Sequence, residues 1–494
     1  MTTIQPARAG EFAVHDPGSG DLVGQYPVHT AAQVRDTVER ARIAGAWWAG
    51  LSYQARGQRL DRFRGVLARR AAQLAGVIHD ETGKPHSDAM LEIALTLDHL
   101  AWAAKNAPKV LGPRRARTGL MMANHVATVG YKPYGVVGVI GPWNYPVFTP
   151  LGSIAYALAA GNAVVFKPSE LTPGTGAWLV EAFAQVVPEH PVLQLVTGDG
   201  STGAALCGAG VDKIAFTGST ATAKKVMAAC APTLTPLVAE CGGKDAVLVD
   251  ADADLDAAAD AAAWAGMANA GQSCIGAERV YVHERVYESF LSKLVAIAGK
   301  ARAGSDPGAQ LGPITLDRQV EIIRRHIDTA VAAGGRVVLG GSDTISGNVV
   351  QPTILVDVPE DAPAVTEETF GPTLTVTSVR DMDEAVELAN ATGYGLGATV
   401  FSRRGKQLAG LLRCGMVALD SVFSYPRIPS LPFGGCGDSG FGRIHGPDGL
   451  REFAYAQSVA RQRFTAPLAL TTFARTPKTD ALVAKVMTLL HGRH

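Results

Sequence analysis

The chain lacks several features that would place it in a specialised class of protein. It has no charge excess, since 45 Lys and Arg balance 45 Asp and Glu, so nothing favours a nucleic acid or an anionic surface as partner. It has no uncharged apolar run of about 18 residues, so we expect no transmembrane helix. Between Met1 and Gly20 no apolar segment follows basic residues, so we expect no signal peptide.

Cysteine is also scarce, at six residues in 494. None forms a Cys-x-x-Cys pair and the histidines do not cluster, so we expect no metal site. So few cysteines in so long a chain are no disulfide scaffold and favour a reducing cytoplasm. The length allows two or three domains, and 47% hydrophobic residues with 55 glycines fit a compact α/β enzyme. The cysteines are Cys207, Cys230, Cys241, Cys274, Cys414 and Cys436.

What the chain does have is a thiol and a carboxylate in two short glycine-bearing loops. Cys274 ends Gly-Gln-Ser-Cys, and Glu240 begins Glu-Cys-Gly-Gly-Lys, with an apolar, Ala-rich stretch between them. A thiolate attacks an electrophilic carbon, and a carboxylate activates water to release the adduct. The pair therefore indicates covalent catalysis through a thioester. A thiol protease fits poorly, because no histidine is placed by a motif to serve Cys274.

Strands and helices alternate along residues 135–250. Short, uninterrupted apolar runs are typical of strands that are buried on both faces. The alternation is typical of βαβ units, so we expect a parallel sheet covered by helices on both faces. The expected strands are 135–140, 163–166, 192–196 and 213–216, and the expected helices are 148–160, 173–187 and 221–229.

A second α/β unit is expected from residue 245 onward, and helices are expected before the first one. The second unit should contain strands at 245–249, 279–282, 374–379 and 398–401, helices at 255–270, 285–302 and 317–333, and a Pro- and Val-rich connection at 345–365. Upstream, residues 31–80 have a helical pattern, and a further helix is expected at 87–105.

Two segments differ from these units. Residues 116–132 contain no acidic residue and alternate β-prone side chains, which favours a protruding hairpin. The tail after residue 466 carries an apolar stripe beside Lys478 and Lys485. We favour packing of this stripe on the body or on a partner subunit over binding to a membrane surface. The stripe comprises Leu482, Val483, Val486, Met487, Leu489 and Leu490.

Polar residues follow two of the expected strands. The side-chain amide of Asn144, in Pro-Trp-Asn-Tyr-Pro, suits an oxyanion hole and equally suits the cap of a rigid turn. Lys167 and Glu170 follow the next strand, at the sheet edge where nucleotides bind, and fit a ribose site or a solvated loop.

Three further motifs are ambiguous on their own. Gly218 and Ser219 precede an expected helix, whose N-terminus suits a phosphate. Glu368 and Phe370 fit a ribose and a flat ring, or a charged turn. A Gly-x-Gly-x-x-Gly over 198–203 is a weak dinucleotide signal, because no acidic residue about 20 positions later ends a following strand.

In their order, these motifs resemble those of the aldehyde dehydrogenase superfamily. The resemblance covers roughly residues 10–465, and the order and spacing make it highly specific. The six motifs are Pro-Trp-Asn-Tyr-Pro (142–146), Lys-Pro-Ser-Glu (167–170), Phe-Thr-Gly-Ser-Thr (216–220), Glu-Cys-Gly-Gly-Lys (240–244), Gly-Gln-Ser-Cys (271–274) and Glu-Glu-Thr-Phe-Gly-Pro (367–372).

The resemblance implies an α/β fold with a Rossmann-like parallel-sheet NAD-binding domain, an α/β catalytic domain and a bridging β-hairpin. The implied boundaries are 1–114 with 134–240 for NAD binding, 241–440 for catalysis, 115–133 with 441–470 for bridging, and 471–494 for an amphipathic tail. Such hairpins join subunits in this family, so a homodimer or homotetramer is expected.

The resemblance also implies residue roles. Cys274 is implied as the nucleophile, Glu240 as the general base, and Asn144 with the Cys274 backbone N–H as the oxyanion hole. The residues implied to hold NAD, with NADP left open, are Trp143, Lys167, Ser169, Glu170, Gly218, Ser219, Glu368 and Phe370. The residues implied to line the substrate pocket are Tyr145, Phe148, Gly152, Ile275 and Phe433.

Two of these residues carry expectations about specificity. Glu170 accepts from both ribose hydroxyls of NAD⁺ and repels the 2′-phosphate of NADP⁺, so NAD⁺ is expected to be preferred. Gly152 lies one helical turn after Phe148 and lacks the bulky side chain that family members often carry there. We expect this glycine to widen the channel for long or bulky aldehydes.

The chain departs from the family pattern at a few points. Ala223 replaces the glycine usual five residues after Gly218, and Cys241 replaces a commoner leucine beside the expected base. An inert packed thiol is the favoured interpretation of Cys241. The tail after about residue 466 lies outside the resemblance.

The implied reaction is oxidation of an aldehyde to its carboxylic acid, through a Cys274 thioester that Glu240-activated water hydrolyses. Two alternatives stay open. One is a CoA-acylating dehydrogenase, which the presence of Glu240 argues against, because that route has little need of a base for water. The other is a catalytically silent protein of the same fold, which the presence of both Cys274 and Glu240 argues against. Which aldehyde is oxidised does not follow from the sequence.

Overall fold

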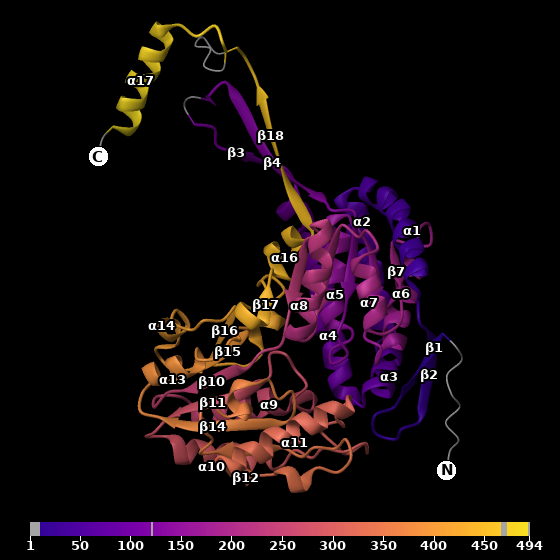
Figure 1. Ribbon diagram of the computed structural model, residues 1–494, viewed down its shortest axis with the longest axis vertical. Helices are drawn as coiled ribbons and strands as arrows, with labels where there is room; N and C mark the ends of the chain where they lie inside the picture. The colour runs from indigo at the N-terminus through magenta and orange to yellow at the C-terminus, as the bar shows by residue number, and fades with distance from the viewer. Residues whose placement is uncertain (1–9, 120–121, 466–471, 493–494) are drawn as a thin grey trace. The chain divides into compact units, whose positions relative to one another are not determined.

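The computed structural model describes residues 10–119, 122–465 and 472–492. It divides into two compact units. The larger unit is Met1–Val110 with Pro133–Ala454, and it contains two large sheets, labelled in Figure 1. The smaller unit is Leu111–Lys132 with Tyr455–His494.

The first large sheet contains the strands that were predicted within residues 135–250. In spatial order it consists of β17 (Gly440–Phe441), β9 (Leu237–Glu240), β8 (Lys213–Thr217), β5 (Val136–Ile140), β6 (Ala163–Lys167) and β7 (Leu193–Leu195). All neighbours are parallel except β17 with β9. The chain runs outward from β5 to β7 and then returns to β8 on the other side of β5. Ligands of such sheets bind where the chain order reverses, at the carboxyl ends of β5 and β8.

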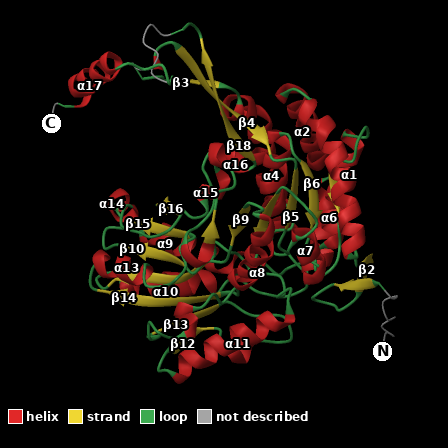
Figure 2. Ribbon diagram, turned by 45° about the horizontal axis from the view of Figure 1, so that its top comes forward, coloured by secondary structure: helices red, strands yellow, loops and turns green. Residues whose placement is uncertain are grey.

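Helices cover both faces of this sheet, as Figure 2 shows. Right-handed crossovers place α5 and α6 on one face, and the returning connection places α7 on the other. One layer contains α2 (Tyr53–Arg69), α5 (Phe148–Ala160) and α6 (Pro173–Val186), and the other contains α1 (Ala31–Gly50), α7 (Gly200–Cys207) and α8 (Thr220–Cys230). Every residue of β5 is buried, and Gly138 is needed there because a Cβ would lie 2.7 Å from Ile214.

The second large sheet has seven strands. In spatial order they are β12 (Arg336–Leu339), β13 (Thr353–Val356), β14 (Thr373–Val379), β11 (Ala277–His283), β10 (Asp245–Val249), β15 (Gly397–Phe401) and β16 (Met416–Leu419), all parallel except β12. The helices beside it include α9 (Leu255–Met267), α10 (Tyr287–Ala298), α11 (Asp317–Ala332) and α13 (Met382–Ala389).

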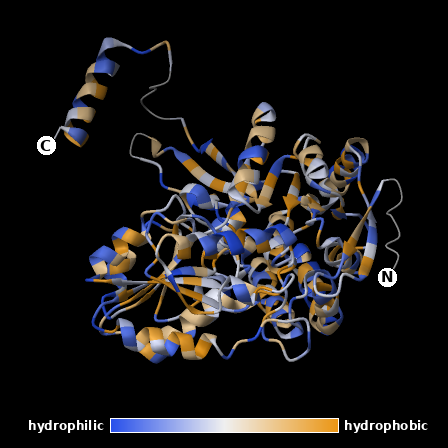
Figure 3. Ribbon diagram, turned by 60° about the horizontal axis from the view of Figure 1, so that its bottom comes forward, coloured by the Kyte–Doolittle hydropathy of each residue, from blue (hydrophilic) through white to orange (hydrophobic). Residues whose placement is uncertain are grey.

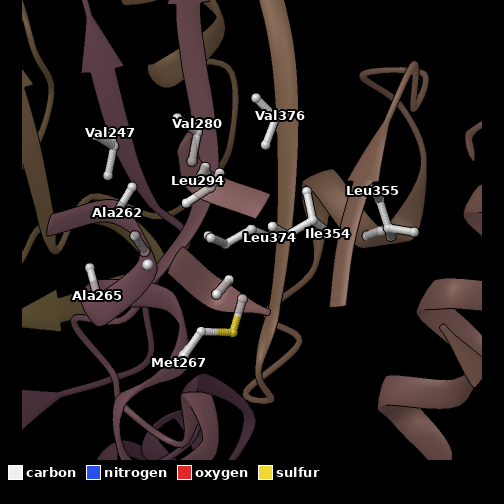
Figure 4. Close-up of a cluster of buried hydrophobic side chains, with 14 of the residues drawn as sticks. Val247, Ala262, Ala265, Met267, Val280, Leu294, Ile354, Leu355, Leu374 and Val376 are labelled. Carbon is white, nitrogen blue, oxygen red and sulfur yellow. The ribbon is translucent and has the colours of Figure 1, made fainter. Parts of the chain in front are cut away.

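The core between this sheet and its helices depends on small side chains in α9. Figure 4 shows Ala262 and Ala265 of α9 near Leu374 and Val280 of the sheet. A Cβ at Gly266 would lie 2.7 Å from Leu374, so the helix approaches the sheet as closely as its backbone allows. This packing fixes the end of α9, which leads directly into the loop of Cys274.

The α/β fold class is confirmed, while several local predictions need correction. The helical stretch 31–80 is three helices, because Ser52 caps α2 and α3 (Ala71–Thr82) starts after Arg70. The connection 345–365 contains β13 and the start of α12 (Pro363–Thr366). The Gly-x-Gly-x-x-Gly lies in the first turns of α7, where Asp199 accepts from the Ser201 N–H. The strands that were not predicted are β1 (Glu11–His15), β2 (Leu22–Pro27), β9, β12, β13, β16, β17 and β18 (Ala454–Gln462).

The smaller unit contains a sheet and a helix. β3 (Arg114–Ala116) and β4 (His125–Pro133) form the predicted antiparallel hairpin, and β18 (Ala454–Gln462) lies on the other side of β4. The tail forms α17 (Pro477–His491), which begins at the N-cap Thr476 and has no buried residue. Figure 3 shows apolar and polar turns along α17. The packing of its stripe stays a prediction.

Two features are absent from residues 10–119, 122–465 and 472–492. No helix there is long and apolar enough to cross a membrane. No group of three or more His, Cys, Asp or Glu in the same residues could hold a metal ion.

Candidate active site

Cys274 and Glu240 line one cavity in the larger unit. The space measures about 830 Å³, counting the solvent at its open end. Its wall comes from α4 (His86–Leu111), the start of α5, the end of α9 and the loops that follow. Four of the predicted pocket residues line it as well, namely Tyr145, Phe148, Ile275 and Phe433.

The loop that carries Cys274 has an unusual backbone. After α9 a short 3-10 segment, Ala268–Gly271, contains Asn269 and Ala270 with φ of 54°, and Gly271 follows with φ of 70°. A Cβ at Gly271 would lie 2.0 Å from the Gly371 oxygen, so only glycine fits there. Left-handed non-glycine residues cost about 1–3 kcal/mol each and persist only where the surroundings hold them. This turn leads into Cys274, which lines the cavity.

Two amide side chains join this loop to the loop after β5. The Asn144 Nδ2 donates to the Gln272 oxygen at 3.0 Å, and Asn144 is buried. Asn269 donates from Nδ2 to the Asn144 oxygen and to the Gln272 oxygen, both at 3.1 Å. The Gln272 Oε1 accepts from the Thr315 N–H at 2.9 Å. Asn144 is therefore held beside Cys274 with a second amide hydrogen left for another acceptor.

Glu240 is a buried carboxyl at the end of β9. Burial raises its pKa to about 7, although the nearby Cys274 thiol and Thr217 hydroxyl lower it. Neither contact has the geometry of a full hydrogen bond, because both Glu240 oxygens are buried without such a partner in the described part of the chain. A carboxyl with a pKa near neutrality suits proton transfer.

The Cys274 thiol is kept in its neutral form by its surroundings. Burial holds its pKa well above the ordinary value, and the neighbouring carboxyls of Glu240, Glu368 and Asp245 add to the effect. A neutral thiol is a weak nucleophile, so this thiol must lose its proton before the sulfur can attack a carbonyl carbon.

A buried ion pair supports the loop of Asn144. The Lys84 Nζ donates to the Glu92 Oε2 at 2.6 Å and to the Asn144 oxygen at 2.7 Å, and both charged side chains are almost fully buried. The Glu92 Oε1 accepts from the N–H groups of Val147 and Phe148, at 2.8 and 3.0 Å. One ion pair thus holds both Asn144 and the N-terminus of α5.

We predict that Glu92→Ala destabilises the protein and lowers kcat together. The change leaves the Lys84 ammonium buried without its carboxylate, which costs about 3–5 kcal/mol. It also frees the loop that aims Asn144. The thermal unfolding midpoint and kcat for one aldehyde measure the two effects.

Glu452→Ala is the control. Glu452 lies outside the cavity and pairs with the buried Lys213 at a distance of 2.7 Å. That variant should lose stability and keep kcat, and equal kcat losses in both variants would refute a positioning role for Glu92.

The predicted ribose residues lie after β6. Lys167 is buried, and its Nζ lies 3.5 Å from the Glu170 Oε2, whose side chain is 51% exposed. Burial lowers the Lys167 pKa, and Glu170 partly opposes the shift. Ser169 donates to the Glu170 Oε2 at 3.4 Å. A buried ammonium beside an exposed carboxylate, at the carboxyl end of a parallel strand, fits ribose hydroxyls.

The predicted phosphate residues lie at the start of α8. The Gly218 N–H donates to the backbone oxygen of Glu240 at 3.1 Å, and a Cβ at Gly218 would lie 2.8 Å from the Phe216 ring. The Ser219 side chain caps α8 by accepting from the Thr222 N–H at 3.4 Å. The helix N-terminus after β8 lies at the reversal of strand order, which fits a pyrophosphate.

A second buried ion pair supports the loop of Glu368 and Phe370. Glu278 pairs with Lys244 and accepts from the N–H groups of Thr369 and Phe370, at 2.8 and 2.9 Å. The Glu368 Oε1 accepts from the Gly243 N–H at 3.1 Å, and burial, with Glu278 adding, raises the Glu368 pKa to about 8.

Phe370 lies beside the loop after β5. Its ring meets that of Trp143 edge to face, with ring centroids 5.6 Å apart. The aromatic pair and the Glu368 carboxyl fit a flat ring and its ribose, so the predicted cofactor residues of three separate loops suit a dinucleotide.

Gly152 was predicted to line the substrate pocket, but the structure places it elsewhere. It is absent from the wall of the cavity. A Cβ there would lie 2.6 Å from Nε2 of His445, a fully buried ring among Phe148, Tyr156 and Phe433. The expectation that Gly152 widens the channel is therefore wrong, since His445 fills the space that the missing side chain leaves.

Sequence reasoning missed Lys84, Glu92, Asn269 and Glu278, which hold the loops. Each acts on a loop far away along the chain, so no local motif identifies it. One sequence signal could have indicated them, namely charged residues at positions that must be buried. Charged side chains are rarely buried unless they are paired, so each such residue implies a partner.

Comparisons with known proteins show the family of the chain. The model of the aldehyde dehydrogenase family matches residues 4–459. A 4,4'-diapolycopene aldehyde oxidase of Methylomonas sp is 38% identical over 472 residues, covering 94% of this chain and 87% of that protein. A Mycolicibacterium smegmatis protein with the provisional name succinate-semialdehyde dehydrogenase [NADP(+)] is 35% identical over 453 residues, covering 90% and 87%.

Solved structures agree as well. An NAD-dependent aldehyde dehydrogenase from Sinorhizobium meliloti has a TM-score of 0.89 at 32% identity, covering 94% of each chain. PnpE in complex with nicotinamide adenine dinucleotide has a TM-score of 0.88 at 32% identity, covering 94% of this chain and 96% of that one.

The fold and the site together define a dinucleotide-dependent oxidoreductase. The chain belongs to the aldehyde dehydrogenase family and is an NAD(P)-dependent enzyme that oxidises an aldehyde. The predictions of family, enzyme class and cofactor are confirmed.

Proposed function

We propose that the enzyme oxidises its aldehyde to the carboxylic acid through a thioester on Cys274, which water activated by Glu240 hydrolyses. The observation that carries this proposal is the placement of Cys274 and Glu240 on the wall of one cavity. The Glu240 pKa, raised to about 7 by burial, suits a base that takes a proton from water near neutral pH.

The first step forms the carbon–sulfur bond. The Cys274 thiol loses its proton to water, and the sulfur attacks the carbonyl carbon while the carbonyl π electrons move to oxygen. The second amide hydrogen of Asn144 and the Cys274 N–H hold this oxyanion. The Cys274 N–H donates to no backbone acceptor among the described residues, which leaves it available. Donors fixed in advance cost no reorganisation when the charge develops.

The second step forms and hydrolyses the thioester. A bound NAD(P)⁺ would supply the acceptor for the hydride that leaves the former aldehyde carbon. Glu240 then takes a proton from water, whose oxygen attacks the thioester carbon. The carbon–sulfur bond breaks, the acid leaves, and Cys274 regains a proton. We assign cofactor binding to Trp143, Lys167, Ser169, Glu170, Gly218, Ser219, Glu368 and Phe370.

The hydrolytic route is favoured over transfer to CoA because Glu240 is buried beside Cys274 with both oxygens available for a proton. Assays with and without CoA test this. The acid should form at the same rate in both, and an acyl-CoA product would contradict the proposal.

Glu170→Gln is predicted to shift cofactor preference toward NADP⁺. The carboxylate accepts from both ribose hydroxyls of NAD⁺ and repels a 2′-phosphate, while the buried Lys167 limits the repulsion. A change of about 1.4 kcal/mol gives about tenfold, so kcat/KM should fall for NAD⁺ and rise for NADP⁺. Glu181→Gln, an exposed change on α6, is the control. A wild type that uses NADP⁺ better than NAD⁺ would show that Glu170 has another role.

Two broader proposals follow, the first from the family resemblance and the second from the scarcity of cysteine. The first is that the enzyme is a homo-oligomer joined through residues 115–133 and the C-terminal segment. The second is that it works in the cytoplasm. The names of the relatives contain two different aldehydes, 4,4'-diapolycopene aldehyde and succinate semialdehyde. The residues that line the cavity help to decide which chemical class of aldehyde the enzyme accepts.

A further inference from the structure

The wall of the cavity around Cys274 is mainly apolar. Ten of its nineteen lining residues are apolar, and the polar ones are Asp88, Glu92, Tyr145, Thr149, Glu240, Asn269, Ser273, Cys274 and Arg427. The apolar lining residues are Leu91, Leu95, Phe148, Trp264, Ala268, Ile275, Phe423, Pro426, Phe433 and Ile444. A pocket with few polar groups binds its ligand by removing apolar surface from water.

Two large apolar side chains of this wall are exposed. Leu91 is 39% exposed on the face of α4 that also carries Leu95, one turn further along. Trp264 is 42% exposed and is the single aromatic residue of the Ala-rich α9. Single exposed apolar side chains are common on proteins, but Leu91 and Trp264 line the same cavity. A ligand that extends out of the cavity between them would cover both side chains.

The charged groups of the wall are unfavourable for an anionic substrate. Asp88, Glu92 and Glu240 are acids, and the oxygens of Glu92 are already used by Lys84 and the start of α5. Arg427 is the one basic lining residue, and it is exposed. A carboxylate on the tail of a substrate would enter between acids in surroundings of low dielectric, where like charges repel strongly.

We propose that the substrate is an uncharged aldehyde with a long apolar tail, which runs from Cys274 past Leu95 and Phe148 to Leu91 and Trp264. This inference rests on the proposed function, because the aldehyde carbon must lie at the sulfur. It names the class of substrate and makes Trp264 a specificity-determining residue.

A series of straight-chain aldehydes tests the class. We expect kcat/KM for propanal, hexanal and decanal to rise by about threefold for each added methylene group until the tail fills the cavity. Equal kcat/KM for propanal and decanal would overturn this inference alone. No turnover of any aldehyde would overturn the proposed function and this inference with it.

Trp264→Ala tests the path of the tail. Alanine is the strongest helix former and α9 is rich in it, so the variant should fold. We expect kcat/KM for decanal to fall about tenfold through KM, while kcat/KM for propanal stays within about twofold. Leu411→Ala, which removes an exposed apolar side chain outside the cavity, should change neither. Equal losses for propanal and decanal would overturn the path.

Succinate semialdehyde tests the opposite class. We expect its kcat/KM to lie below that of hexanal, and Arg427→Ala to change it less than about threefold. A kcat/KM above that of hexanal that is lost in Arg427→Ala would overturn the inference, because it would show that Arg427 recognises a carboxylate.

Discussion

Cys274→Ala is expected to abolish NADH formation from every aldehyde while the enzyme still binds NAD⁺. The variant removes the sulfur that forms the covalent bond, and no other thiol can replace it. Of the five remaining cysteines, none lines the cavity. Cys241 follows Glu240 directly but is buried, and burial raises its pKa to about 12. The loss should exceed about 10⁴-fold, as for other enzymes that lose their nucleophile.

The measurement pairs steady-state NADH absorbance with calorimetric titration of NAD⁺. Cys436→Ser is the matched control, because Cys436 lies outside the cavity and its weak contact with the Gly395 oxygen is open to a serine hydroxyl. That variant should retain full turnover. Steady turnover by Cys274→Ala at more than about a hundredth of the wild-type rate would refute covalent catalysis by Cys274.

Glu240→Gln is expected to separate the two halves of the reaction. Glutamine cannot take a proton from water, so hydrolysis of the thioester should slow by about 10²–10⁴-fold. The first NADH should still form, with a burst amplitude of about one per site. The burst survives because the Glu240 carboxylate itself raises the pKa of the Cys274 thiol, and its removal lets the thiol ionise more readily.

The pH dependence provides the control for this variant. Because the Glu240 pKa is raised to about 7, its ionised fraction grows as the pH rises through neutrality. Steady-state kcat of the wild type should therefore increase between about pH 6 and pH 8, and this increase should vanish in Glu240→Gln. Rapid-mixing records at several pH values measure both phases. A variant whose steady rate matches the wild type would exclude Glu240 as the base for water.

The sequence identified the candidate residues of the site more readily than the residues that hold their loops in place. Cys274, Glu240 and Asn144 are found through short motifs, because a reacting group and its loop lie together in the chain. The ion pairs of Lys84 with Glu92 and of Lys244 with Glu278 connect residues from different elements. Such pairs are created by folding, so no local pattern predicts them.

The same reason explains the error at Gly152. Helical spacing correctly predicts that Gly152 and Phe148 share one face of α5, but it does not show which residue faces that glycine. His445, nearly three hundred positions later and with φ of 62°, fills the space. Short strands were missed for a related reason. β9 and β16 have only four residues each, too few for a clear strand pattern, and their pairing with longer strands stabilises them.

The most direct test of the mechanism is the mass of the intact Glu240→Gln enzyme after rapid mixing with an aldehyde and NAD⁺, followed by acid quenching. The proposed thioester predicts that each subunit gains the mass of the aldehyde less two hydrogen atoms, and that peptide mapping finds this gain on Cys274. The gain should disappear when NAD⁺ is left out. No gain in mass, or a gain on a different cysteine, would contradict the mechanism.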